Sequence, residues 1–367
     1  MAGEDTPRYD PSIYDTPFSK LPNPKRVWIG EPGSALEGIG RLSLLTPTIV
    51  SAAATSEIKT GQRVGLGWDM TKLEYSQFGR QKCGHKIVPL WGPGGSGYGA
   101  CFDDVYHMNP QQSSQWDGFR HYSQPCNPSD PSTSQDRVFY GGTTKEEILD
   151  PSNKRIGLQH WASEGIAGRG ILIDYHHYCT AQTPPIEFSN FSTHAISLAT
   201  LKTILSAQNT QLSKGDILFI RMGVIPEWDS FSDEQKRAYA ELETPQHAGV
   251  EASLELLEWL WDEGISAVAG DAISWEVFPM PGEISCHEYL LGGWGMPIGM
   301  FVRLLFPFED LLVVSANSRQ LRSGEIFDLE ALSQTCRSLN RYSFFVTSMP
   351  LNMPGGVSSP PNAMAIF

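Results

Sequence analysis

Apolar positions in the middle of the chain alternate between a helical period and short unbroken runs. Residues 195–208 and 250–264 carry apolar side chains three and four positions apart, which predicts two helices. Each is followed by a compact apolar run, at 214–223 and 265–271, that is typical of a buried strand. Residues 157–175 predict a short helix, a glycine turn and a strand. Because helices and strands alternate, we expect an α/β or α+β fold that forms one compact domain.

The N-terminal part of the chain has a weaker pattern. Residues 1–26 are polar and rich in Pro and Asp, so we expect an irregular N-terminal arm, with the domain itself spanning residues 27–367. Leucines at 42–45 predict a helix, and residues 48–50 predict the start of a strand. The apolar run at 87–90 contains a proline, which places it at the edge or the end of a strand.

Composition narrows the class of partner. The net charge is −14, charged residues make up 19% of the chain, and no long Lys/Arg cluster is present, so we expect neither nucleic acid nor an anionic membrane as a partner. A small-molecule substrate fits better. The N-terminus has no apolar signal segment, which predicts a cytoplasmic protein. The six cysteines lack C-x-x-C spacing, so we expect free thiols rather than disulfides or a thiolate zinc site.

A polar stretch at residues 111–121 is the candidate site. Alternate side chains of an extended segment face the same side, so the odd-numbered polar residues would converge: Gln111, Gln115, Asp117 and His121. Their oxygen and nitrogen atoms suit a divalent metal ion. The alternative is a polar surface loop whose carboxylate and imidazole bond to backbone groups.

The run Gln-Trp-Asp-Gly-Phe-Arg-His at 115–121 resembles the motif His-x-Gly-Thr-His-x-Asp-x-Pro-x-His of the cyclase family that includes the bacterial-type kynurenine formamidases. The resemblance implies that Asp117 binds a metal and that His121 is the catalytic histidine. It places Gln111 and Gln115 where the family has two metal-binding histidines. An amide oxygen is a poorer zinc ligand than imidazole and suits harder cations, so the resemblance implies a divalent metal ion without deciding between Zn²⁺ and Mn²⁺.

Other segments are similar to the family in the same order, namely residues 157–175, 214–223, 286–299, 325–332 and 344–367. The resemblance implies that His287 and Glu325 are further metal ligands. We assign Trp116 and Arg221 to substrate binding, although an arginine that closes a strand is more often an ion-pair partner.

An apolar insertion at residues 300–324 interrupts the resemblance, because the family's glutamate follows the glycine equivalent to Gly299 almost directly. Our hypothesis is a retained intron translated in frame. The alternative is an extra hairpin that packs on the body.

The resemblance implies a swivelling β/β/α domain with a mixed sheet and flanking helices. It also implies a metal-dependent hydrolase or cyclase acting on a small carbonyl substrate, with arylformamidase-like hydrolysis of the amides of tryptophan catabolism as the best-known case. One alternative is a lactone-forming or lactone-opening cyclase of secondary metabolism. Another is a non-catalytic or mis-spliced family member. A homodimer is possible.

Overall fold

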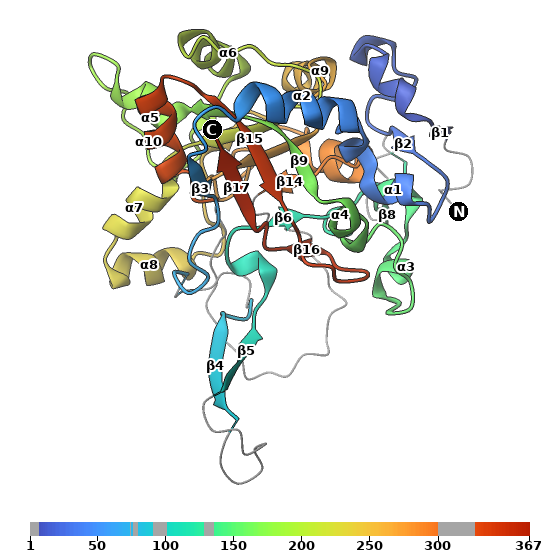
Figure 1. The fold of residues 1–367 in the computed structure, drawn as a ribbon, viewed down its shortest axis with the longest axis horizontal. Coiled ribbons are helices and arrows are strands. Elements are labelled where there is room, and N and C mark those ends of the chain that lie inside the picture. The colour runs from blue at the N-terminus through green and yellow to red at the C-terminus, as the bar shows by residue number, and fades with distance from the viewer. Residues whose placement is uncertain (1–6, 74, 76–79, 91–100, 128–135, 300–326) are drawn as a thin grey trace.

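A mixed sheet organises the part of the chain that the computed structural model describes, which comprises residues 7–73, 75, 80–90, 101–127, 136–299 and 327–367 (Figure 1). Its nine strands have the order β16-β6-β14-β13-β11-β9-β15-β17-β3. The central neighbours β9, β11, β13 and β14 are parallel, and the remaining pairs are antiparallel. The bounds are β3 (Arg63–Gly65), β6 (Trp116–Asp117), β9 (Ile166–Asp174), β11 (Ile217–Arg221), β13 (Ala267–Gly270), β14 (Ile298–Gly299), β15 (Ser343–Ser348), β16 (Ser358–Ser359) and β17 (Ala363–Ile366).

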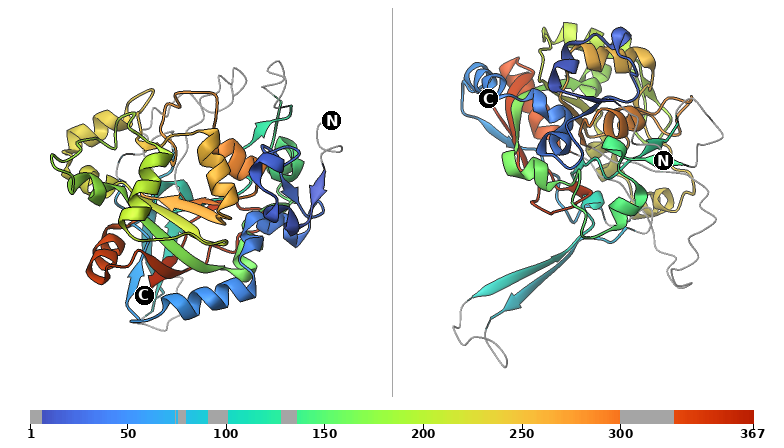
Figure 2. Two further views of the ribbon diagram at one scale, coloured as in Figure 1. Left: turned by 90° about the horizontal axis from the view of Figure 1, so that it is seen from above. Right: turned by 90° about the vertical axis from the view of Figure 1, so that its right-hand side faces the viewer.

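Helices surround this sheet (Figures 1 and 2). They are α1 (Ala35–Ile39), α2 (Pro47–Glu57), α3 (Lys145–Leu149), α4 (Gln159–Glu164), α5 (Tyr175–Thr180), α6 (Leu198–Ala207), α7 (Val224–Ser230), α8 (Asp233–Ala240), α9 (Leu254–Asp262) and α10 (Glu330–Leu339). Short helical turns are η1 (Pro11–Asp15), η2 (Phe18–Lys20), η3 (Gly40–Leu44), η4 (Pro110–Gln112), η6 (Tyr140–Gly142) and the π-helical η7 (Glu288–Gly293). The predicted α/β class with a mixed sheet and flanking helices is confirmed.

Four further strand pairs lie outside the large sheet. They are β1 (Arg8–Tyr9) with β2 (Trp28–Ile29), β4 (Gly84–Pro89) with β5 (Phe102–His107), β7 (Gln124–Pro125) with β8 (Arg137–Val138), and β10 (Ala195–Ile196) with β12 (Gly249–Val250). The β4–β5 hairpin projects away from the body (Figures 1 and 2). The apolar run at 87–90 enters β4, and Pro89 is the last residue of that strand, as expected for a proline.

The parallel centre of the sheet is apolar because helices cover both its faces. Consecutive residues of β9 at 171–173 and of β11 at 217–220 are all buried. Ser197 and Ser253 accept hydrogen bonds from backbone N–H groups at the starts of α6 and α9, so each predicted helix begins at a side-chain cap. The predicted helices and strands between 195 and 271 are therefore confirmed in kind, with small shifts in their ends.

One local prediction is wrong. Residues 48–50 lie in helix α2, not in a strand, because Thr46 caps this helix and Pro47 occupies its first turn, where proline costs no hydrogen bond. The glycine turn expected between the short helix and the strand is confirmed at Gly165, which ends α4, has φ +75° and directly precedes β9. Gly170 is instead inside β9, where a Cβ atom would lie 2.3 Å from the ring of Phe344 on β15. Glycine there permits close packing of two strands rather than a turn.

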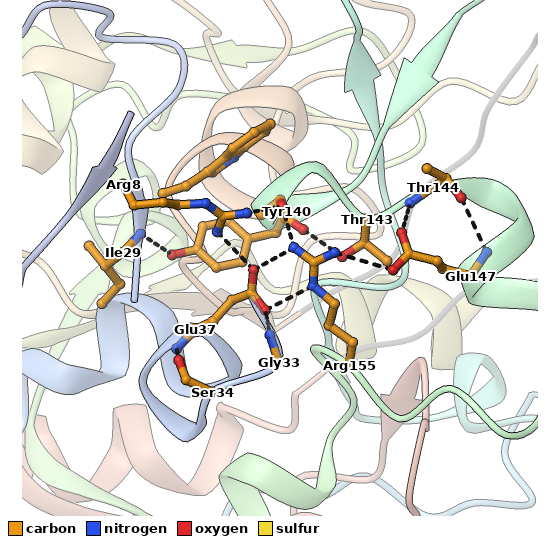
Figure 3. A network of polar contacts seen from close by, with 12 residues as sticks. Arg8, Ile29, Gly33, Ser34, Glu37, Tyr140, Thr143, Thr144, Glu147 and Arg155 are labelled. Atoms are coloured by element: carbon orange, nitrogen blue, oxygen red, sulfur yellow. Dashed lines mark hydrogen bonds and ion pairs between the residues drawn. The ribbon is translucent and has the colours of Figure 1, made fainter. Parts of the chain in front are cut away.

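The described part of the N-terminal arm packs on the body. Tyr14 and Phe18 are buried. Glu37, which is fully buried, pairs with Arg8 of the arm at 2.8 Å and with Arg155 of the body at 2.8 Å (Figure 3). The same carboxylate accepts a hydrogen bond from the N–H of Gly33 at 2.6 Å. A buried carboxylate shared by two guanidinium groups thus joins the arm to the body.

The insertion at 300–324 lies outside the described residues. Among the residues that are described, each helix is too short or too polar to cross a membrane. All six cysteines are free, as expected.

Candidate active site

Asp117 is the centre of the polar stretch. It lies on β6, paired with Ile298 of β14 on one side and with Ser358 of β16 on the other, and it is fully buried. Its Oδ1 atom accepts hydrogen bonds from the side-chain amides of Gln111 at 2.6 Å and Gln115 at 2.9 Å. The structure therefore brings both glutamines to the aspartate.

The turn η4, rather than a continuous extended segment, positions Gln111. The side chain of Asn109 accepts a hydrogen bond from the backbone N–H of Gln111 at 3.0 Å and caps this turn. Only residues 116–117 of the polar stretch form a strand. The expectation of a fully extended stretch is corrected, because Pro110 at the start of the turn favours a bend there.

His121 is the fourth polar residue at the site. Its backbone N–H donates to Gly118 at 2.9 Å, and its Nε2 lies 3.7 Å from Oδ2 of Asp117. Burial lowers the pKa of His121 to about 3, and the nearby guanidinium of Arg80 acts in the same direction. The imidazole is therefore neutral near pH 7, and its proximity to Asp117 is that of a neutral base to a carboxyl group rather than an ion pair.

Burial also shifts the pKa of the Asp117 carboxyl group. It raises the pKa of Asp117 to about 7, against the opposing effects of His287 and of the Gln111 hydrogen bond. A positive charge placed beside Asp117 would favour its ionised form.

His287 is the N-cap residue of the π-helical turn η7 and directly precedes it. Its Nδ1 lies 2.7 Å from Oε2 of Glu276, and both side chains are buried. The ring also packs against the ring of Tyr122, with centroids 5.2 Å apart. With Nδ1 facing a carboxylate, Nε2 is the nitrogen that carries the free lone pair.

Several buried acceptors at the site suit a divalent cation. Among the described residues, Oε1 of Gln111, Oδ2 of Asp117 and Nε2 of His287 have no hydrogen-bond partner. Burying such atoms unsatisfied is costly, and a cation would satisfy lone pairs of this kind. The described residues contain no group of three or more His, Cys, Asp or Glu side chains arranged for a metal ion. The donor set is thus a mixture of amide, carboxylate and imidazole, which favours a harder cation over a closed zinc site.

The other predicted site residues have different surroundings. Trp116 is buried, donates its indole N–H to Ser348 at 2.9 Å and packs against Phe327. Arg221 pairs with Asp174 at 2.8 Å and with Glu330 at 2.7 Å. These contacts are with the protein itself, and a substrate role for Trp116 or Arg221 stays a prediction. Glu325 lies outside the described residues.

Sequence reasoning missed two residues near the site, Glu276 and Arg80. Glu276 contacts His287 from a segment with no recognisable motif. Arg80 donates to the backbone carbonyl of Gln111 at 3.2 Å and influences the pKa of both Asp117 and His121. No spacing in the sequence links either residue to 111–121, because the links arise only from the fold.

Comparison with known proteins identifies the family to which the chain belongs. A model of the family described as Putative cyclase matches residues 45–277, which is more than half of the chain. A search of curated proteins found no significant match.

Solved structures share the fold. A structure described as a novel cyclase is 23% identical, with a TM-score of 0.68 over 90% of this chain and 96% of that one. Isatin hydrolase A from Ralstonia solanacearum is 13% identical, with a TM-score of 0.52 over 87% of this chain and 95% of that one. An isatin hydrolase bound to the product analogue thioisatinate is 13% identical, with a TM-score of 0.50 over 86% of this chain and 95% of that one. At these identities the likeness is one of fold.

Proposed function

Because this chain belongs to the Putative cyclase family, we propose that it is a metal-dependent hydrolase that cleaves the C–N bond of a small amide, as an arylformamidase does. The observation that carries the proposal is the buried set of unsatisfied acceptors on Gln111, Asp117 and His287, next to a neutral His121. The fold shared with an enzyme named isatin hydrolase supports hydrolysis in general. It does not select the substrate.

The residues that would hold a divalent cation are Asp117, through Oδ2, and His287, through Nε2, with an amide oxygen of Gln111 or Gln115. A cation bound there would polarise a substrate carbonyl and make water more acidic. The amide N–H groups of Gln111 and Gln115 hold the other oxygen of Asp117 and so fix the direction of Oδ2. Preorganised donors of this kind need no rearrangement during the reaction.

His121 is the proton-transfer group in this proposal. Its imidazole is unprotonated near pH 7, and an ionised Asp117 beside it would raise its basicity, so that Nε2 accepts a proton from the attacking water. The carboxylate of Asp117, 3.7 Å away, would stabilise the imidazolium that forms. The same nitrogen would then return the proton to the leaving amine. The Asp117 side chain is fully buried and that of His121 is 15% exposed, which limits competition from bulk water.

A non-catalytic family member is the second candidate, and one observation favours it. Glutamines occupy the positions where the resemblance puts two metal-binding histidines, and both amides already bond to Asp117. If these contacts are the final state of the site, the protein would bind neither metal nor substrate productively. Metal analysis of the purified protein separates the two candidates.

The test is hydrolysis by the purified full chain supplied with Mn²⁺ or Zn²⁺ and assayed on N-formylkynurenine, on isatin and on a simple aryl lactone. The proposal expects cleavage of at least one amide that stops with a chelator and returns with metal. Cleavage of the lactone alone would favour the lactone-opening alternative. Absence of both metal binding and turnover would favour the non-catalytic one.

A further inference from the structure

We propose that Glu276 is a positioning residue that fixes the ring of His287 in the tautomer with the proton on Nδ1, leaving the Nε2 lone pair for the site. Only the use made of that lone pair rests on the proposed function. The assignment itself concerns two side chains of this chain and stands on their geometry.

The contact between the side chains of His287 and Glu276 is favourable when the facing ring nitrogen carries a proton. Nδ1 of His287 and Oε2 of Glu276 lie 2.7 Å apart, and the side chains are 2% and 5% exposed. A lone pair on nitrogen facing a carboxylate oxygen at this distance would be repelled, whereas an N–H group would be attracted. Water is largely excluded, so it offers little compensation for the wrong tautomer. The contact therefore favours the proton on Nδ1.

Glu276 also holds the backbone of the residue whose ring it orients. Its Oε1 atom accepts a hydrogen bond from the backbone N–H of His287 at 3.3 Å and one from the hydroxyl of Ser285 at 3.4 Å. One oxygen thus fixes the helical turn and the other fixes the ring. Rotation of the imidazole by half a turn would break the second contact while leaving the first in place.

The segment that carries Glu276 is itself held by backbone hydrogen bonds. The N–H of Val250 donates to Trp275 at 2.8 Å, and the N–H of Val277 donates to Val250 at 2.9 Å, so Glu276 is bracketed by two bonds to one residue. A charged acceptor on a fixed backbone is well suited to orient a ring.

The opposite nitrogen of the ring has a free lone pair. Nε2 of His287 is buried and has no hydrogen-bond partner among the described residues. A carboxylate that orients an imidazole on one side, with a bare nitrogen on the other, is the arrangement that directs a histidine toward a cation.

The test compares Glu276→Gln, Glu276→Ala and the control Glu288→Gln. Glu288 is the next residue after His287 and pairs with Lys25 and Arg137, so its change removes a nearby charge without touching this contact. The first readout is the ¹⁵N spectrum of histidine-labelled, chelator-treated full chain, which distinguishes a protonated ring nitrogen from a bare one. The second is the affinity for Mn²⁺ by titration calorimetry.

The proposal expects the Nδ1–H form of His287 in the wild type and in Glu288→Gln. Glu276→Gln should keep the Nδ1–H form, because its carbonyl oxygen still accepts a hydrogen bond from Nδ1–H. Glu276→Ala should lose this form. Mn²⁺ affinity should fall by about 10- to 100-fold in Glu276→Ala and by less in Glu276→Gln. An Nε2–H form in the wild type, or an unchanged Nδ1–H form in folded Glu276→Ala, would overturn the assignment.

The test separates failure of the Glu276 assignment from failure of the proposed function. If Glu276→Ala does not fold, the wild-type spectrum and the Glu276→Gln variant still decide the tautomer. If no form of the protein binds Mn²⁺, the proposed function fails, but the ring spectrum still tests Glu276.

Discussion

Nε2 of His121 lies 3.7 Å from Oδ2 of Asp117, and the two side chains come from a single tight segment in which His121 donates its backbone N–H to Gly118. The segment therefore fixes the imidazole and the carboxyl group relative to each other. Such preorganisation suits the hydrolytic role proposed for this site.

His121→Ala is expected to lower turnover by about 10²- to 10⁴-fold, as the loss of a general base does, while leaving metal retention intact. The physical reason is that His121 acts on the proton and is not among the groups assigned to the cation. Steady-state kinetics and metal analysis of the same preparation check this. Loss of metal from the variant would make His121 a ligand instead.

Asp117 gives the metal-free protein a pH-dependent stability. Burial raises the pKa of its carboxyl group in the folded state from 3.8 to about 7, so the folded protein holds a proton that the unfolded chain releases. The resulting stabilisation is complete below about pH 4 and is lost as the pH rises through 7, and it amounts to at most about 4 kcal/mol.

Melting temperatures of wild type and Asp117→Asn, measured in a chelator from pH 4 to 8, test this. Asparagine does not titrate, and its carbonyl oxygen still accepts from the two glutamine amides. The wild type should therefore lose stability relative to the variant as the pH rises. Parallel curves would show that Asp117 has an ordinary pKa in the fold.

Arg221 is expected to contribute to the free energy of unfolding rather than to substrate binding. Its guanidinium is 6% exposed and pairs with Asp174 and Glu330. Arg221→Met should lower the free energy of unfolding by about 3–5 kcal/mol, because buried charges lose their partner. The exposed Arg237, which donates a hydrogen bond to the hydroxyl of Tyr75, supplies the control, and Arg237→Met should leave stability nearly unchanged. An unchanged urea midpoint for Arg221→Met, with a raised KM, would instead support the substrate role.

The sequence predicted the central elements well because their signals are local. The helix at 195–208 has its own apolar period and cap, and the strand at 217–220 is a continuous apolar run. Residues 48–50 were mistaken for a strand because β-branched side chains outweighed the cap at Thr46.

The site was only partly predictable for the opposite reason. Asp117, His121 and the two glutamines fall within eleven residues and match a motif, so they could be found together. Glu276 and Arg80 reach the same site from distant segments, and their roles depend on tertiary contacts that no periodicity records. The ion pairs of Arg221 were equally invisible, since Glu330 is far along the chain.

The nearest described residues on either side of the apolar insertion, Gly299 and Phe327, both contact β13 or the residue at its end. Gly299 pairs with Ala269 of β13, and the N–H of Phe327 donates to the next residue, Gly270, at 3.3 Å. A Cβ atom on Gly299 would lie 2.6 Å from the ring of Phe327. Two residues are enough to join such neighbours, since three successive Cα–Cα steps span up to about 10 Å.

A chain lacking residues 300–324 is therefore expected to fold, to be more soluble and to melt at a higher temperature, because the deletion removes an apolar segment without stretching the sheet. It should also bind metal more tightly. Calorimetry and solubility measurements on the full and the deleted chain check these expectations. The spliced transcript should lack the segment. A deleted chain that is less stable, with a transcript that retains the segment, would make it a genuine structural element.

Metal retention by wild type, Asp117→Ala and His287→Ala after loading with Mn²⁺ and gel filtration is the most direct test of the account. The site has few strong donors, so loss of either should leave too few to hold the ion. We predict about one ion per wild-type chain and less than about one-tenth of that in each folded variant. Full occupancy in both variants, or none in the wild type, would contradict the assignment of Asp117 and His287 to a metal site.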